Sequence, residues 1–109
     1  MSNRTEKLNP LIQQKLGQII SQELEFPENA LVTITRVQTS PDIKHATVFI
    51  TILPEKFRGT VLEILRKNKP ILRQQLKKQM ATKFIPKLKF EIDENEIYAS
   101  EIDKILDEL

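Results

Sequence analysis

The residues best suited to chemistry in this chain are basic, and they are concentrated in one stretch. Residues 64–90 contain no aspartate or glutamate and nine basic side chains: Arg66, Lys67, Lys69, Arg73, Lys77, Lys78, Lys83, Lys87 and Lys89. Residues 1–63 are balanced in charge, whereas residues 91–109 carry eight acids against Lys104 alone. Cations without nearby carboxylates produce a positive field where their side chains converge. The pattern favours binding of a polyanion, with nucleic acid as the leading class.

Catalysis and metal binding find little support in the residue types. The chain has no cysteine, which excludes disulfides, thiolate nucleophiles and cysteine metal sites, and its single histidine excludes a two-histidine zinc site. The sequence places no serine or carboxylate beside His45, so we do not expect a general base there. Structural roles are expected for the basic residues near the strands, which are Arg36, Lys44 and His45. Three acids that could hold Mg²⁺ are expected to be solvated in a surface turn: Asp93, Glu94 and Glu96. We predict no catalytic residue, no metal site and no cofactor.

Length and composition predict one globular domain. The chain has 109 residues, of which 39% are hydrophobic and 29% charged, as in ordinary soluble proteins. It has no apolar run of about 18 residues that could span a membrane. The first ten residues, MSNRTEKLNP, lack the apolar core of a signal peptide, so we expect a cytoplasmic protein.

The first half of the chain predicts a helix followed by a hairpin. Apolar residues between positions 8 and 24 recur at helical spacing. Proline is tolerated in a first helical turn, so Pro10 places the start of this helix near Asn9. Residues 31–38 and 43–53 are rich in β-branched side chains and predict two strands joined by turn residues 39–42. In the second strand, one face is expected to carry Ala46, Val48, Ile50 and Ile52.

The second half predicts two helical segments and a third strand. Apolar residues from Val61 indicate a helix that breaks at residues 68–70 and resumes to about Lys83, with Pro86 ending it. Residues 87–93 alternate as in a strand, with Leu88, Phe90 and Ile92 inward. Phe49, Phe84 and Phe90 are all expected in the core, and residues 97–109 suggest an acidic terminal helix. The order predicts an α+β fold with helices on one face of a three-stranded sheet.

Several segments together resemble the bacterial ribosome-binding factor A family. They are VTITRVQTSPDIKHATVFITIL (32–53), the pair Leu72-Arg73, FIPKLKFEID (84–93), the leading helix with Arg4 and Lys7, and the trailing SEIDKIL. The resemblance implies a single type II KH-like domain over residues 1–93, with residues 94–109 as an acidic C-terminal helix or tail packed on it. It also implies binding of 16S rRNA in the immature 30S subunit and help in late maturation, including 5′-end processing, without catalysis. The family is further associated with growth in the cold, a monomeric state and release by a ribosome-dependent GTPase.

One feature of ordinary KH domains is absent from this sequence. Their GxxG loop needs glycine so that the backbone can approach a phosphate, but glycine occurs here only at positions 17 and 59. The family replaces that loop with a kinked helix pair, and the matching kink positions here are Asn68 and Pro70. The basic residues predicted to bind RNA are Arg66, Lys67, Lys69, Arg73, Lys77, Lys83 and Lys87. Lys77 and Lys78 cannot face the same way on a helix, so one of them is ordinary surface.

Two other interpretations of the basic block remain open. It could be only a solvated helical face, or the face of a protein-interaction adaptor that binds an acidic partner. Phosphate contacts would make binding to naked RNA strongly dependent on salt, which discriminates between the RNA and adaptor hypotheses.

Overall fold

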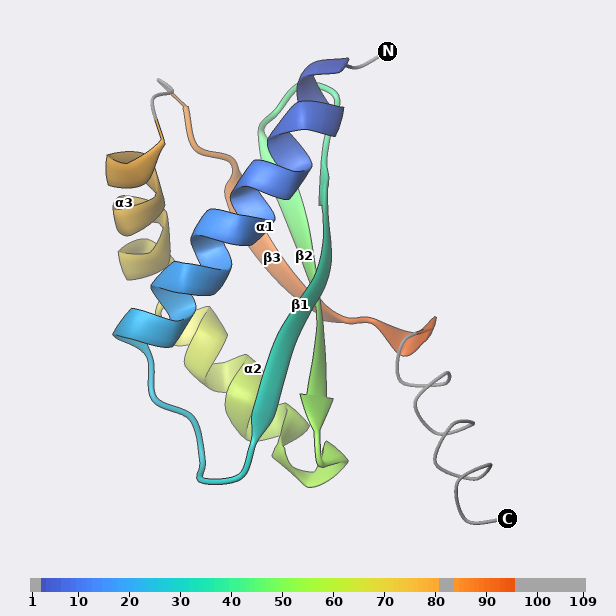
Figure 1. The fold of residues 1–109 in the computed structure, drawn as a ribbon, viewed down its shortest axis with the longest axis vertical. Helices are drawn as coiled ribbons and strands as arrows, with labels where there is room; N and C mark the ends of the chain where they lie inside the picture. Colours follow the sequence, from blue (N-terminus) through green and yellow to red (C-terminus); the bar gives the residue numbers. More distant parts are fainter. Residues whose placement is uncertain (1–2, 81–83, 96–109) are drawn as a thin grey trace.

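The described residues form an α+β arrangement of three α-helices and one small sheet (Figure 1). The computed structural model describes residues 3–80 and 84–95. In chain order the elements are α1 (Asn3–Glu23), β1 (Leu31–Thr39), β2 (His45–Leu53), the short 3-10 helix η1 (Glu55–Phe57), α2 (Arg58–Lys67), α3 (Lys69–Gln79) and β3 (Lys87–Ile92). This is the helix-strand-strand-helix-helix-strand order predicted for a type II KH-like domain, so that prediction is confirmed. No helix in the described ranges is long and apolar enough to cross a membrane.

The sheet is mixed, with β2 between β1 and β3. The predicted β1–β2 hairpin is confirmed: the two strands pair antiparallel, from Leu31 opposite Leu53 to Thr39 opposite Ala46. β3 pairs parallel to β2, with Lys87 opposite His45. Parallel neighbours need a crossover connection, and α2 and α3 supply it. The pairing therefore brings the start of β3 to the same end of the sheet as the hairpin turn.

The core lies between the helices and one face of the sheet. The inward residues of β2 are fully buried, as predicted: Ala46, Val48, Ile50 and Ile52. The helices cover them with a second set of buried side chains: Ile12, Leu16, Ile19, Val61, Leu65, Leu72 and Leu76. Leu88 and Phe90 of β3 are also buried, whereas Ile92 is only half-buried. The prediction that the helices share one face of the sheet is confirmed.

α1 begins earlier than the sequence predicted. It starts at Asn3 rather than near Asn9, and Pro10 lies inside it. Two side chains bind α1 to β1 on either side of this proline. Asn9 Oδ1 accepts hydrogen bonds from Thr39 N at 3.0 Å and Thr39 Oγ1 at 2.5 Å, and Gln13 Nε2 donates to the Ile34 carbonyl at 3.1 Å. Tertiary contacts thus stabilise a helix that local propensity alone would shorten.

α3 ends earlier than predicted. Met80 adopts an extended conformation, with φ −108° and ψ 134°, so the helix stops at Gln79 instead of continuing to about Lys83. Pro86 is therefore not what ends it. Residues 81–83, including Lys83, lie outside the described residues, as does the acidic terminal helix expected at 97–109.

Candidate nucleic-acid interface

The break between α2 and α3 is formed by Asn68. Its backbone, at φ −101° and ψ 11°, is not helical, and its side-chain Nδ2 donates to the Ile64 carbonyl at 2.7 Å, which closes the end of α2. Its own carbonyl accepts from Leu72 N at 3.0 Å and so begins α3. Pro70 has no N–H, so it cannot donate to the Arg66 carbonyl as a continuous helix would require. The predicted kink at Asn68 and Pro70 is confirmed.

Three cations form a row along one side of α3. Lys69, Arg73 and Lys77 are spaced by four residues, so they lie on the same side of the helix. Each neighbours the buried stripe that contains Leu72 and Leu76. Arg73 contacts the segment just before β3, which shows that this side of α3 faces the start of that strand, where Lys87 is exposed. Lys78 directly follows Lys77, so it lies on a different side of α3.

Arg66 and Lys67 are exposed at the end of α2, just before Lys69 in the chain. Lys67 Nζ lies 3.7 Å from Glu63 Oε1, but these side chains are 75% and 68% exposed, so solvent and salt weaken the pair. Within residues 3–80 and 84–95, no ion pair is formed by Arg66, Lys69, Lys77 or Lys87. We call the set Arg66, Lys67, Lys69, Arg73, Lys77 and Lys87 the cationic row. Little carboxylate charge opposes it, so a bound polyanion would be attracted.

Arg73 has a structural task that the sequence did not reveal. Its Nη2 donates to the Ile85 carbonyl at 2.9 Å and its Nε donates to the Pro86 carbonyl at 3.3 Å. The side chain thereby joins α3 to the segment that leads into β3. A guanidinium carries five N–H donors, so further donors remain for a ligand. Arg73, which the sequence predicted only as an RNA-binding residue, thus also has a structural role.

We expect Arg73→Lys to lower the free energy of unfolding by about 1 kcal/mol, because a lysine keeps the charge but cannot make both directed bonds to the carbonyls. Urea denaturation would measure this change. Lys77→Arg, on the same side of α3, is the matched control and should leave stability unchanged. Equal midpoints for wild type and Arg73→Lys would show that the two hydrogen bonds contribute nothing.

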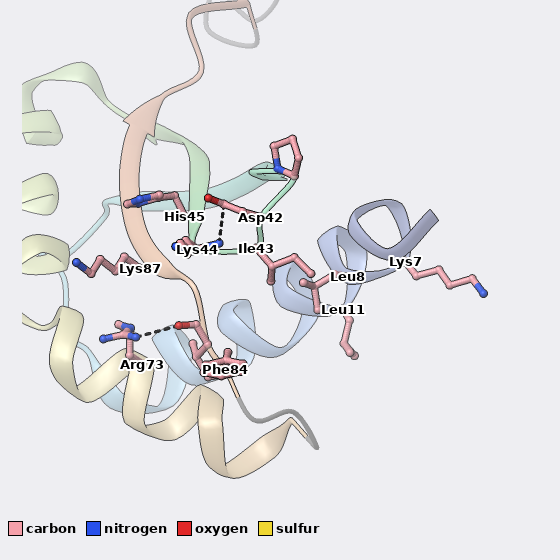
Figure 2. A pocket seen from close by; sticks show the side chains of 12 residues that line it. Lys7, Leu8, Leu11, Asp42, Ile43, Lys44, His45, Arg73, Phe84 and Lys87 are labelled. Atoms are coloured by element: carbon pink, nitrogen blue, oxygen red, sulfur yellow. Dashed lines mark hydrogen bonds between the residues drawn. The ribbon is translucent and has the colours of Figure 1, made fainter. Parts of the chain in front are cut away.

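A groove lies where α1, the hairpin turn and the start of β3 meet (Figure 2). Its lining residues are Lys7, Leu8, Leu11, Pro41, Asp42, Ile43, Lys44, His45, Arg73, Phe84, Ile85 and Lys87. In the turn, Asp42 Oδ1 accepts hydrogen bonds from Ser40 Oγ at 2.6 Å and from Lys44 N at 3.0 Å. The bond from Ser40, followed by that from the Lys44 backbone, lowers the pKa of Asp42 below its ordinary value. These bonds stabilise the ionised form of the one carboxylate that lines the groove and hold it against its own turn.

The phenylalanines at positions 49, 84 and 90 occupy three different environments. Phe90 is 1% exposed and lies in the core, as predicted. Phe49 is half-buried on the opposite sheet face, with the Arg36 guanidinium 3.9 Å from its ring centroid. Phe84 is 78% exposed, so the prediction that it lies in the core is wrong. Phe84 precedes the alternating strand pattern of residues 87–93. That position was the only sequence signal that distinguished it from the buried Phe90.

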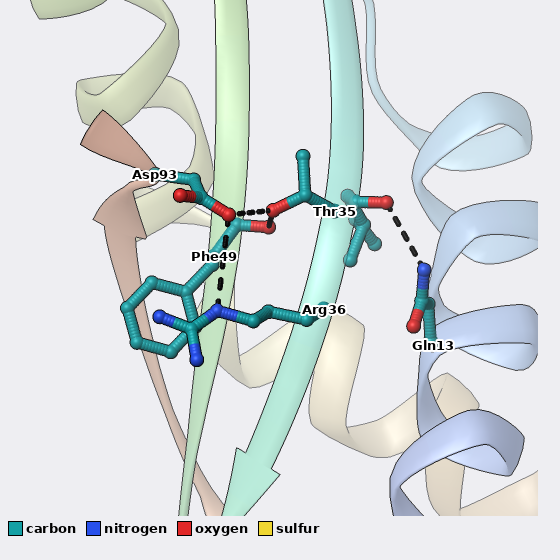
Figure 3. A network of polar contacts seen from close by, with 6 residues as sticks. Gln13, Thr35, Arg36, Phe49 and Asp93 are labelled. Carbon is teal, nitrogen blue, oxygen red and sulfur yellow. Dashed lines mark hydrogen bonds and ion pairs between the residues drawn. The ribbon is translucent and has the colours of Figure 1, made fainter. Parts of the chain in front are cut away.

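Asp93 is not the solvated acid that the sequence suggested. Asp93 is 7% exposed, and its Oδ2 accepts a hydrogen bond from Thr35 Oγ1 at 2.5 Å (Figure 3). Arg36 Nε lies 3.8 Å from the same oxygen. Thr35 sits at a bulge in β1, where an extra residue re-aims a side chain. The carboxylate thus links the end of β3 to β1 across the open sheet face.

Among the described residues, no group of three or more histidines and acids could hold a metal ion. Asp93 is already bonded to its neighbours, and Glu94 is exposed. Glu96 lies outside the described residues.

Residues 4–106 match the family described as ribosome-binding factor A. The chain belongs to the ribosome-binding factor A family. Ribosome-binding factor A of Macrococcus caseolyticus is 34% identical over 110 residues, covering 100% of this chain and 96% of that protein. The Pseudomonas aeruginosa protein of the same name is also 34% identical, over 96% of this chain and 84% of its own length.

Solved structures of ribosome-binding factor A have the same fold. The crystal structure from Thermus thermophilus has a TM-score of 0.72 at 24% identity and covers 81% of this chain and 93% of that one. The solution structure of a putative family member from Thermotoga maritima has a TM-score of 0.71 at 26% identity, covering 84% and 88%. A third, a homology model of the Thermus thermophilus protein fitted into a cryo-EM map of its complex with 30S, has a TM-score of 0.67 at 24% identity, covering 76% and 88%.

Proposed function

We propose that this protein is an assembly factor that binds 16S rRNA in the immature 30S subunit and assists its late maturation, including 5′-end processing, without catalysing a reaction. The observation that carries the proposal is the cationic row. An acid-free stretch of sequence places cations on α2, α3 and β3, and Arg73 joins α3 to the segment before β3. Membership of the ribosome-binding factor A family supports a ribosomal partner.

The mechanism that we propose is electrostatic docking on folded RNA. Lysine and arginine contacts to phosphates position a protein on RNA but carry no base sequence information, so selectivity would come from the shape of the rRNA. A ligand shifts a conformational equilibrium only by its difference in affinity for the two states. The protein would thus favour the rRNA conformation whose phosphates match the spacing of the cationic row.

We further propose that the protein acts as a cytoplasmic monomer, supports growth in the cold and leaves the subunit through a ribosome-dependent GTPase. The fitted Thermus thermophilus complex is a precedent for the 30S partner in that relative. The remaining proposals rest on the family resemblance alone.

Co-sedimentation with purified subunits tests the proposed function. A tagged copy of the full chain, mixed in turn with immature and mature small subunits, should sediment preferentially with the immature particles. Large subunits serve as the control and should not carry the protein. Failure to sediment with either form of the small subunit would overturn the proposal.

The second candidate function is a protein-interaction adaptor, in which the cationic row binds an acidic protein. The apolar side chains in the groove, including Leu8 and Leu11, favour it because they could accept apolar residues of a partner. Binding to naked small-subunit rRNA separates the two functions. If four to six cations contact phosphate, the slope of log K against log salt should be roughly −3 to −5. A slope near zero favours the adaptor.

A further inference from the structure

The groove combines charged and apolar walls, and the proposed function above uses only part of it. Its basic side chains come from four separate segments: Lys7 on α1, Lys44 and His45 near the hairpin turn, Arg73 on α3, and Lys87 at the start of β3. The backbone holds two of these segments together, because Lys87 N donates to the Lys44 carbonyl at 2.9 Å. Asp42 is the one acid in the lining, and its carboxylate accepts hydrogen bonds from Ser40 and the Lys44 backbone. Lys44, Arg73 and Lys87 outnumber this single carboxylate, so the charged wall is suited to an anion.

The apolar wall is formed by Leu8, Leu11, Ile43 and Phe84. Leu11 is 38% exposed and Phe84 is 78% exposed, so both offer surface to a ligand. Ile43 has φ 62°, a left-handed conformation that is unusual for a β-branched residue, and its N–H bonds to the Ser40 carbonyl at 2.9 Å. Figure 2 shows Lys44, His45, Arg73 and Lys87 on one side, Leu8, Leu11 and Ile43 on the other, and Phe84 between Arg73 and Leu11 in this view.

We propose that this groove binds a short single-stranded RNA segment, with a base stacked on Phe84 and its phosphates on Lys44 and Lys87. A nucleotide joins a flat base to an anionic phosphate, which is the pairing that the two walls provide. Proteins bind single strands by stacking bases on aromatic rings beside a basic groove. Paired bases in a duplex are already stacked and are not available to such a ring. The inference rests on the proposed RNA-binding function and adds a second type of contact to it.

One observation favours RNA over an acidic peptide. Arg73 and Lys87 belong both to the groove and to the cationic row, so one continuous basic surface would serve duplex phosphates and an adjoining single strand. The groove volume of ≈ 1070 Å³ slightly exceeds the roughly 300–1,000 Å³ typical of small-ligand pockets. It therefore has room for more than one nucleotide.

A tryptophan placed at position 84 tests the stacking directly. The chain contains no tryptophan, so Phe84→Trp introduces a single selective fluorophore into the full chain. Titration with oligoadenylate should quench its fluorescence and reduce its access to acrylamide, whereas a duplex hairpin RNA should do neither. Leu31→Trp is the matched control, because Leu31 is 61% exposed at the opposite end of the sheet. Its fluorescence should not respond to either RNA.

Affinity measurements give a second readout. Phe84→Leu keeps an apolar side chain but removes the ring, so oligoadenylate affinity should fall roughly five- to a hundredfold. Phe84→Tyr should retain the affinity, and neither substitution should change binding of the duplex hairpin. Equal oligoadenylate affinity for Phe84→Leu and wild type would overturn the inference.

The outcomes distinguish this inference from the function on which it rests. If the Phe84→Trp protein still binds immature subunits but its fluorescence does not respond to oligoadenylate, the groove does not bind single-stranded RNA and the proposed function stands. A synthetic acidic peptide with the sequence of residues 94–109 is the alternative ligand. If this peptide reduces the access of acrylamide to the tryptophan and oligoadenylate does not, the groove binds peptide and the inference is wrong. If the protein binds neither subunits nor any RNA, both proposals fail together.

Discussion

Replacing Arg66 and Lys69 together by glutamate should lower the affinity for small-subunit rRNA by about thirtyfold or more at physiological salt, because each lost phosphate contact forfeits counterion release worth roughly fivefold. Glutamates at these positions would also repel phosphate. Both substitutions flank the kink, and neither original side chain forms an ion pair among the described residues. Binding to an rRNA fragment at several salt concentrations is the measurement. The magnitude of the salt slope should fall by about two.

The matched control reverses Lys56 and Lys89, which gives the same change in net charge away from the kink. Lys56 lies 5.2 Å from the Phe57 ring, and Lys89 Nζ lies 2.9 Å from Glu91 Oε1. This variant should keep most of the affinity and nearly the wild-type slope. Equal losses in the two double variants would mean that net charge alone, rather than the cationic row, determines binding. Circular dichroism should show that both variants remain folded.

Phe90→Ala should have the largest effect on stability. The ring is 1% exposed and lies opposite Val48 in the parallel pairing of β2 and β3. Removing a buried phenylalanine costs about 3–5 kcal/mol, because apolar contacts are lost and a cavity remains. A domain of this size has a total stability of only about 5–15 kcal/mol. Thermal unfolding should therefore shift down by about 10–30 °C, and differential scanning calorimetry would measure it.

Phe84→Ala is the control for Phe90→Ala, since it removes the same atoms from the same type of residue. Phe84 is 78% exposed, so its loss should change the free energy of unfolding by no more than about 0.5 kcal/mol. Comparable destabilisation by the two substitutions would contradict the burial difference between them. The pair also separates stability from binding, because only Phe84 lines the groove.

The sequence by itself determined the order of elements and the helix break, because these depend on local patterns. Alternation of apolar residues along β2 predicted which of them would be buried, and all four are. The Asn68-Pro70 pair predicted the kink, since proline lacks the N–H that a continuous helix needs. The same local reasoning misplaced the start of α1, because side-chain bonds from Asn9 and Gln13 to β1 stabilise a helix through Pro10.

Only the tertiary structure decided which members of the basic block come together and which of the aromatic and acidic residues are exposed. Lys69, Arg73 and Lys77 share a side of α3, but Arg73 is partly used to hold the segment before β3. Phe84 and Phe90 look alike in sequence, yet one is at the surface and the other in the core. Asp93 looked like a solvated acid until the bulge in β1 placed Thr35 against it. Periodicity describes one element at a time, whereas these outcomes depend on which element packs beside it.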